Sequence, residues 1–152
     1  MKTKTLKSIF AIIILAISLN SCSKNEETVT APPPPGKSEF LYAEGGAPTF
    51  SSTSDATART SSGEIFGRNG GTEIVKIKLS SLVVGFYEIN AVNQFTYTRP
   101  ATSSPWIAGM GSIIITEVTP TTISGAFELN SGTSTLGINT VKGIFNNVPI
   151  QP

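Results

Sequence analysis

Val75-Lys76-Ile77-Lys78-Leu79 alternates apolar and charged residues over its whole length. Because successive side chains of a strand point to opposite faces of a sheet, the three apolar residues are expected to face a core and the two lysines to face water. This stretch therefore predicts a half-buried antiparallel strand.

Similar short stretches of β-branched and aromatic residues occur on both sides of this strand, separated by turn-forming pieces rich in Gly, Asn, Pro and Ser. The further expected strands are 40–43, 64–68, 82–90, 94–99, 112–118, 123–130 and 138–146. No stretch shows a sustained apolar period of 3.6 residues. About eight short strands over residues 38–152 predict an all-β domain, a single antiparallel β-sandwich or barrel.

Three of the expected strands share an aliphatic residue, a glycine and an aromatic residue at alternate positions. These are Val83-x-Gly85-x-Tyr87, Ile123-x-Gly125-x-Phe127 and Val141-x-Gly143-x-Phe145. A glycine inside a strand leaves room for a neighbouring aromatic ring or for a bend in the sheet. We expect the pattern to serve packing and not ligand binding. The stretch 44–63, rich in Gly, Ser and Thr, is expected to be a mobile loop because it is longer than ordinary connections.

The first 22 residues carry a targeting signal. Three lysines at positions 2, 4 and 7 precede an apolar run at 9–19, about half of the ~20 residues that a membrane-spanning helix needs. The run is followed by Leu19-Asn20-Ser21-Cys22, which resembles the lipobox of bacterial lipoproteins. The resemblance implies that residues 1–21 are a signal peptide and that Cys22 carries lipid, including acyl chains such as palmitate, as a membrane anchor. The alternative is an ordinary secreted protein with a spare thiol.

The residues after Cys22 indicate where the anchor places the protein. No Asp follows the cysteine directly, which disfavours retention at the inner membrane, and Lys24 to Glu27 resembles export signals of some outer-membrane lipoproteins. An outer-membrane location is expected. Export to the cell surface is one interpretation of the charges at Lys24 to Glu27, and the start of a solvated linker is the other. Residues 22–37 contain Pro32-Pro33-Pro34-Pro35 and predict a disordered, extended tether with a reach of up to ~50 Å.

Three stretches near the C-terminus carry a family resemblance. Residues 111–118, 123–129 and 141–150 resemble the C-terminal half of a group of small Gram-negative lipoproteins that have a β-rich domain of unknown function. The resemblance covers about residues 40–150 and implies a cell-envelope lipoprotein with an all-β domain. It supplies no catalytic residues.

The composition excludes several classes of site. The 152-residue chain has no His, a single Asp and a single Cys, which excludes zinc fingers, His-based triads, EF-hands and disulfide scaffolds. Without the lysines at 2, 4 and 7, eight basic residues stand against ten acidic ones, so nucleic acid is not an expected partner. No metal or other cofactor is expected. The acidic residues are scattered, so we do not expect an enzyme, although a small hydrolase remains an alternative.

The candidate binding residues are Trp106, Tyr97 and Arg99. Residues 99–105 predict a loop with proline at positions 100 and 105, followed by the only Trp of the chain. Trp106 either covers one end of the core or, with Tyr97 and Arg99, offers an aromatic and cationic surface to a sugar or peptide. The sequence therefore favours a non-catalytic binding module for glycan, peptide or protein. The alternative is an accessory subunit that docks on an outer-membrane complex through a sheet edge.

Overall fold

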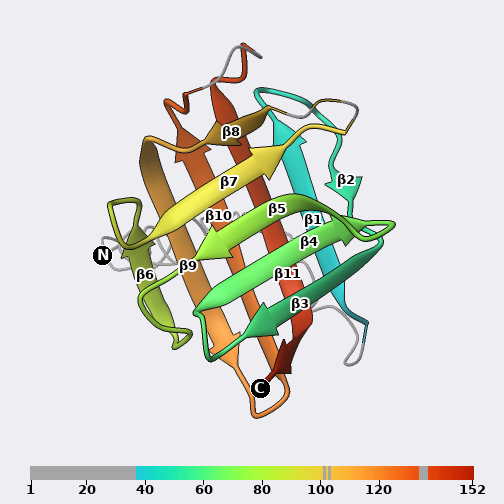
Figure 1. Cartoon of the computed structure of the whole chain (residues 1–152), viewed down its shortest axis with the longest axis vertical. Coiled ribbons are helices and arrows are strands. Elements are labelled where there is room, and N and C mark those ends of the chain that lie inside the picture. The colour runs from blue at the N-terminus through green and yellow to red at the C-terminus, as the bar shows by residue number, and fades with distance from the viewer. Residues whose placement is uncertain (1–36, 101, 103, 134–136) are drawn as a thin grey trace, which may run out of the picture. The chain divides into compact units, whose positions relative to one another are not determined.

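The computed structural model describes residues 37–100, 102, 104–133 and 137–152. The predicted signal peptide, Cys22 and nearly all of the predicted tether lie outside these residues. The described residues from 37 to 152 belong to one compact unit. Its described elements are all strands, so the predicted all-β fold is confirmed (Figure 1). Within the described residues, no helix has the length and apolar character to cross a membrane.

Eleven strands form one continuous sheet among the described residues. They are β1 (Glu39–Glu44), β2 (Ser51–Ser52), β3 (Asp55–Arg59), β4 (Glu64–Asn69), β5 (Thr72–Lys78), β6 (Gly85–Glu88), β7 (Gln94–Thr98), β8 (Pro105–Ile107), β9 (Met110–Val118), β10 (Thr122–Asn130) and β11 (Thr140–Gln151). Their order is β6-β9-β10-β11-β3-β4-β5-β7-β8, with β1 also paired to β11 and β2 to β1.

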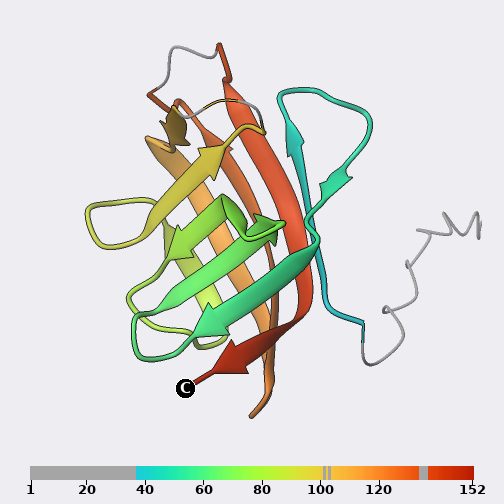
Figure 2. The ribbon, with the colours of Figure 1, turned by 45° about the vertical axis from the view of Figure 1, so that its right-hand side comes forward.

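The long strand β11 belongs to two layers and joins them. Its first part pairs antiparallel with β10 and β1. Its last residues, Ile150 and Gln151, run parallel to β3. The sheet therefore curls at β11 into a half-barrel, in which β3, β4, β5, β7 and β8 cross in front of β9, β10, β11 and β1 (Figures 1 and 2).

The core lies between these two layers. As the alternation in the sequence predicts, Val75, Ile77 and Leu79 are buried, whereas Lys78 is exposed and Lys76 partly so. The centre of the core is aromatic: Phe95 lies 5.0 Å from Phe127 and 6.1 Å from Trp106 between ring centroids. Side chains from both layers thus contact one another across the curl.

Two of the three predicted glycine–aromatic patterns pack against each other across neighbouring strands. Gly125 on β10 is the partner of Phe145 on β11, and Phe127 on β10 is the partner of Gly143 on β11. A Cβ atom on Gly125 would lie 2.5 Å from the Phe145 ring, and one on Gly143 would lie 2.9 Å from a carbon of the Phe127 ring. Each ring therefore occupies the space that a side chain on the facing glycine would need.

The third pattern is different because it lies at the end of the sheet. Gly85 has open space around it, with only the ring of its own neighbour Tyr87 in ordinary contact. Val83 is exposed and lies before β6. The Tyr87 hydroxyl donates to the Val83 carbonyl at 2.8 Å, where the chain bends at residues 83 and 84, and the predicted strand 82–90 is reduced to β6.

The prediction of a mobile loop over residues 44–63 is wrong, because these residues include β2 and β3. In β3, Ala56 and Ala58 alternate with polar residues and are buried, and their backbone pairs with β4. The small side chains of Ala56 and Ala58 thus form the core-facing side of β3, whereas larger apolar residues form the core-facing side of other strands.

Candidate functional site

Tyr97 and Arg99, two of the three predicted binding residues, meet Glu44 at the end of β1. The Tyr97 hydroxyl donates a 2.5 Å hydrogen bond to Glu44 Oε1. The Arg99 Nε donates to both carboxylate oxygens, at 2.9 and 3.1 Å, and its Nη2 also donates to Oε2. Strand β1 thus supplies a carboxylate that is held by the phenol of Tyr97 on β7 and by the guanidinium of Arg99, the first residue after β7.

These contacts control the charges of the cluster. The hydrogen bonds from Arg99 lower the pKa of Glu44 despite its partial burial, so the carboxylate stays ionised. Burial and the neighbouring Glu44 charge raise the pKa of Tyr97, which stays a neutral donor. Burial likewise raises the pKa of Tyr42, whose ring lies 5.4 Å from that of Tyr97. The cluster therefore carries one paired positive and negative charge over a wide pH range.

The cluster lines an open hollow of about 320 Å³. Its wall consists of residues from β1, the connection to β2 and the end of β7: Tyr42, Ala43, Glu44, Ala47, Thr49, Ser51, Tyr97, Arg99 and Pro100. The Arg99 side chain is 37% exposed and that of Glu44 is 28% exposed. Both charged groups are therefore accessible to a ligand in the hollow.

Trp106 is not part of this surface, and the prediction of an aromatic platform at this residue is corrected. Its side chain is 0% exposed, and its Nε1 donates to the Ile138 carbonyl at 2.8 Å. Gly132 lies so close to the indole that a Cβ there would be 2.5 Å from one of its ring carbons. Trp106 instead belongs to the core, as the alternative interpretation of the sequence expected.

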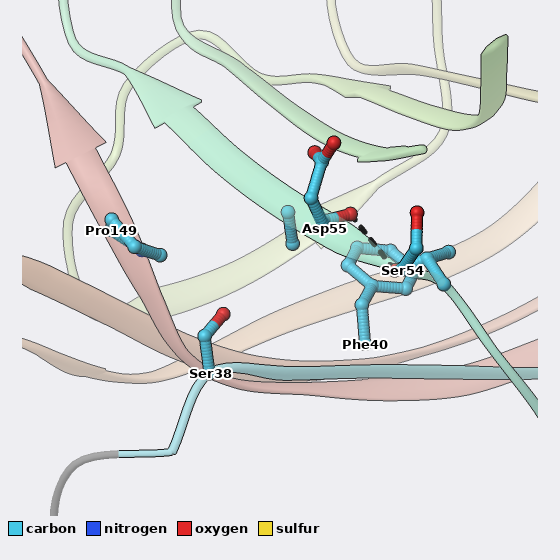
Figure 3. Close-up of a pocket in the computed structure, with 7 residues that line it drawn as sticks. Ser38, Phe40, Ser54, Asp55 and Pro149 are labelled. Atoms are coloured by element: carbon cyan, nitrogen blue, oxygen red, sulfur yellow. Dashed lines mark hydrogen bonds between the residues drawn. The ribbon is translucent and has the colours of Figure 1, made fainter. Parts of the chain in front are cut away.

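A second hollow, of about 280 Å³, lies around the start of β3 (Figure 3). It is lined by Ser38, Phe40, Thr53, Ser54, Asp55, Ala56 and Pro149. Two of its hydroxyl groups bond the backbone: the Thr53 hydroxyl donates to the Asp55 carbonyl at 3.0 Å, and the Ser54 hydroxyl donates to the Arg68 carbonyl at 3.0 Å. These bonds stabilise the backbone that leads into β3.

The remaining charged residues form local pairs on the outer face of the front layer. Lys76 lies 2.9 Å from Glu64, and Arg68 lies 4.0 Å from Asp55. The Ser62 hydroxyl and Lys76 lower the pKa of Glu64. Three cations, those of Arg59, Arg68 and Lys76, lie 5.4, 4.4 and 5.5 Å from the centre of the Phe66 ring. In the part of the chain described, no three potential metal-ligating side chains cluster.

Glu44 is the site residue that the sequence did not indicate. It lies 53 residues before Tyr97 and 55 before Arg99, at the end of a strand that the sequence did predict. Only the pairing of distant strands brings it to the other two. The predicted lipid attachment site, Cys22, lies outside the described residues.

Comparison with known proteins gives a family match over most of this domain. The model of a family described as a domain of unknown function (DUF6252) matches residues 43–149, from the end of β1 almost to the end of β11. No curated protein and no solved structure matches the chain.

Proposed function

The chain belongs to the DUF6252 family, and from its own residues we propose that it is a lipid-anchored protein of the outer membrane whose β domain is a non-catalytic binding module. The ligand is a glycan or a peptide that enters the hollow at Arg99, Tyr97 and Glu44. The observation that carries the proposal is the exposure of the Arg99–Glu44 pair in that hollow.

The hollow has the chemistry of a polar binding site. A guanidinium recognises carboxylate groups through paired hydrogen bonds, and hydroxyl-rich sugars hydrogen-bond to both Arg and Glu side chains. Thr49 and Ser51 add hydroxyl groups to the lining of the hollow. The hollow thus offers donors and acceptors to a ligand whose own groups are polar.

The same contacts favour binding over catalysis. A general acid must carry a proton at working pH, and a general base must have a lone pair directed at its substrate. Glu44 is kept ionised by Arg99, and both of its oxygens accept hydrogen bonds from Arg99 or Tyr97. This carboxylate is arranged to hold its neighbours in place.

The anchor rests on the sequence pattern at Leu19 to Cys22. With β1 starting at Glu39, the 16 residues from 23 to 38 separate the modified cysteine from the sheet. At up to ~3.3 Å per residue they could hold the domain as much as ~50 Å from the membrane. A tether of this reach suits a module that binds ligands beyond the lipid surface.

Ligand binding is tested with residues 23–152 on glycan and peptide arrays. Thr49→Trp fills the hollow without removing the Arg99–Glu44 pair and should abolish the binding seen with the unmodified chain. Thr72→Trp, at an exposed position at the start of β5, is the matched control and should bind normally. Ligands that bind both variants equally well, or no ligand at all, would contradict the proposed site.

The anchor is tested separately in whole cells by labelling with palmitate. The unmodified chain should incorporate label and fractionate with the outer membrane, whereas Cys22→Ala should do neither. Ser23→Ala keeps the cysteine and serves as the control. An unlabelled, soluble chain would rule out the lipid anchor but would not contradict the proposed binding site.

One observation favours the alternative function, an accessory subunit that docks through a sheet edge. Strand β6 ends the described sheet and pairs on one side only, with β9. Crosslinking in cells followed by membrane-protein purification tests this function, since a docked subunit should be recovered with a specific outer-membrane partner.

A further inference from the structure

The outer face of the back layer carries an apolar row that crosses five strands. The row follows the strand register: Phe86 on β6 pairs with Ile114 on β9, which pairs with Ala126 on β10, then Ile144 on β11 and Leu41 on β1. Phe86 is 60% exposed and Ile114 42%. The row thus becomes more exposed toward β6, the end of the sheet (Figure 1).

Exposed apolar side chains gather at this end of the sheet. Of the nine large hydrophobic residues that are exposed in the described part of the chain, six lie on β6, in the segments that flank it in the sequence, or on β9: Val83, Val84, Phe86, Val92, Met110 and Ile114. The neighbouring row on the same face is polar, with Glu88, Ser112, Glu128 and Lys142. An apolar surface with a polar border is typical of a protein contact.

The backbone of β6 leaves hydrogen-bonding groups open at this edge. Ile89 N donates to Gly111 O at 3.0 Å, so residues 89 and 111 form a hydrogen-bonded pair of the β6–β9 ladder. Because such pairs alternate along antiparallel strands, Phe86 and Glu88 direct their backbone groups away from β9. The Glu88 carbonyl accepts from the amides of Asn90 and Asn93, both at 3.1 Å. Both backbone groups of Phe86 and the N–H of Glu88 therefore face the open edge.

Strand β8, at the other end of this strand order, is bridged at one residue. Thr133 N donates to the carbonyl of Ile107 at 3.0 Å on the outer edge of β8. The β6 and β8 edges thus differ: the β8 edge is bridged at Ile107, and the β6 edge combines open backbone groups with exposed apolar side chains.

We propose that β6 pairs antiparallel with β6 of a second copy of this chain, about a two-fold axis at Phe86. Phe86 presents both an N–H and a C=O, so two copies can exchange both bonds at this residue, as a hydrogen-bonded antiparallel pair does. The two Phe86 side chains become neighbours on one face, and the apolar row continues from one copy into the next.

The charges of the edge fit this register. Glu88 is the only charged residue of β6. Pairing at Phe86 places each Glu88 opposite Val84, and the two carboxylate-bearing residues are then about 14 Å apart along the strands, beyond the screening length of ~8 Å. A partner strand thus meets an apolar residue and not a like charge across from Glu88. The pairing is independent of the proposed ligand site, which lies at β1 and β7.

Sedimentation of residues 23–152 and cysteine crosslinking test the pairing. The unmodified chain should associate to a dimer as its concentration rises toward about 1 mM, the weak end of measurable association. Phe86→Lys should remain monomeric, because a lysine at an edge opposes pairing. Ile107→Lys, an exposed apolar residue of the bridged strand β8, should associate like the unmodified chain. Circular dichroism checks that all three chains keep their strand content.

Crosslinking also tests the register. Residues 23–152 contain no cysteine, so Phe86→Cys introduces a single thiol. The expected spacing of about 5.5 Å between the two Cα atoms suits a disulfide, and mild oxidation should give a covalent dimer. Val92→Cys, also exposed but outside the strand, should crosslink far more slowly. A chain that stays monomeric at every concentration, equal crosslinking at both positions, or a photo-crosslinker at residue 86 that captures only another protein in cells would overturn the proposal.

Discussion

Gly125 and Gly143 are positions where a single methyl group has a predictable cost. An alanine at either position would place its Cβ against a phenylalanine ring of the facing strand and against a backbone oxygen of a neighbouring strand. Gly125→Ala and Gly143→Ala should each lower the free energy of unfolding by about 1–3 kcal/mol, the range for overpacking a core. Urea denaturation of residues 23–152 measures the change.

Gly85→Ala is the control for these two glycines. It has the same place in its motif, but the nearest atom to its added Cβ is a Tyr87 ring carbon at 3.7 Å. Its stability should therefore remain within a few tenths of a kcal/mol of the unmodified chain. A similar loss at all three positions would show that glycine flexibility, and not the facing ring, matters.

Trp106 is expected to contribute stability and not binding. Trp106→Ala should lower the free energy of unfolding by about 3–5 kcal/mol, because it leaves a large cavity and an unpaired Ile138 carbonyl. The fluorescence of the unmodified chain should be blue-shifted and resistant to soluble quenchers. Ile107→Ala, at the exposed neighbour, should change stability little. Red-shifted, quenchable fluorescence would contradict the buried position.

The Arg99–Glu44 pair predicts a pH dependence of stability. Because the pKa of Glu44 in the folded chain is lowered below the ordinary 4.5, the pair stabilises the fold fully above pH 4.5 and loses this effect as the pH falls through the folded pKa. Arg99→Gln should therefore lower the urea midpoint more at pH 7 than at pH 3. Arg59→Gln is the control and should change the urea midpoint by the same amount at pH 7 and at pH 3. An Arg99→Gln effect independent of pH would contradict the argument.

At the scale of single strands, the sequence predicted those whose buried face carries large apolar residues. The alternation at 75–79 and the β-branched residues at 112–118 suffice because burial on one face fixes a period of two. Strands β2, β3 and β8 were missed for different physical reasons. Strand β2 consists of two serines and has no apolar alternation. In β3, the buried residues Ala56 and Ala58 are only weakly apolar, and β8 is three residues long and starts with proline.

Strands should also differ in how well they protect their amide groups from hydrogen exchange. β10 pairs along its length with β9 on one side and β11 on the other, and it buries Ile123, Phe127 and Leu129. Its amides should exchange slowest, near the rate set by global unfolding, and those of β2 should exchange much faster. Mass spectrometry of residues 23–152 measures both. Comparable protection in β2 and β10 would contradict the structure.

At the scale of the whole molecule, the sequence predicted two of the three residues of the candidate site, Tyr97 and Arg99. Tyr97 and Arg99 are near each other along the chain, so local sequence sufficed to group them. Glu44 joins them only because β1 pairs with β11 and the sheet curls, and neither periodicity nor composition specifies which strands become neighbours. The role of Trp106 depended on the same curl, which places the connection after β10 over the indole.

The end of β11 should be essential for joining the two layers. A chain that stops at residue 148 loses the backbone pairs of Ile150 and Gln151 with β3, and also the bond from Ile150 N to Thr121 O at 2.8 Å. Its melting temperature should fall by several degrees. Gln151→Ala keeps the backbone and should melt like the unmodified chain. Equal melting of the shortened chain would mean that side-chain packing alone holds the layers together.

The pairing of β1 with β11 also constrains how the chain reaches its fold in time. Glu44 pairs with Val141 and Glu39 with Asn146, residues 97 and 107 positions further along. Contacts this distant in sequence slow folding, and the ribosome makes β1 and β3 long before the strand that pairs with both. Until β11 emerges, both strands expose edges that can pair with other chains. A cell that makes this domain must therefore keep a nascent chain of about a hundred residues apart from its neighbours, a task for a holding chaperone.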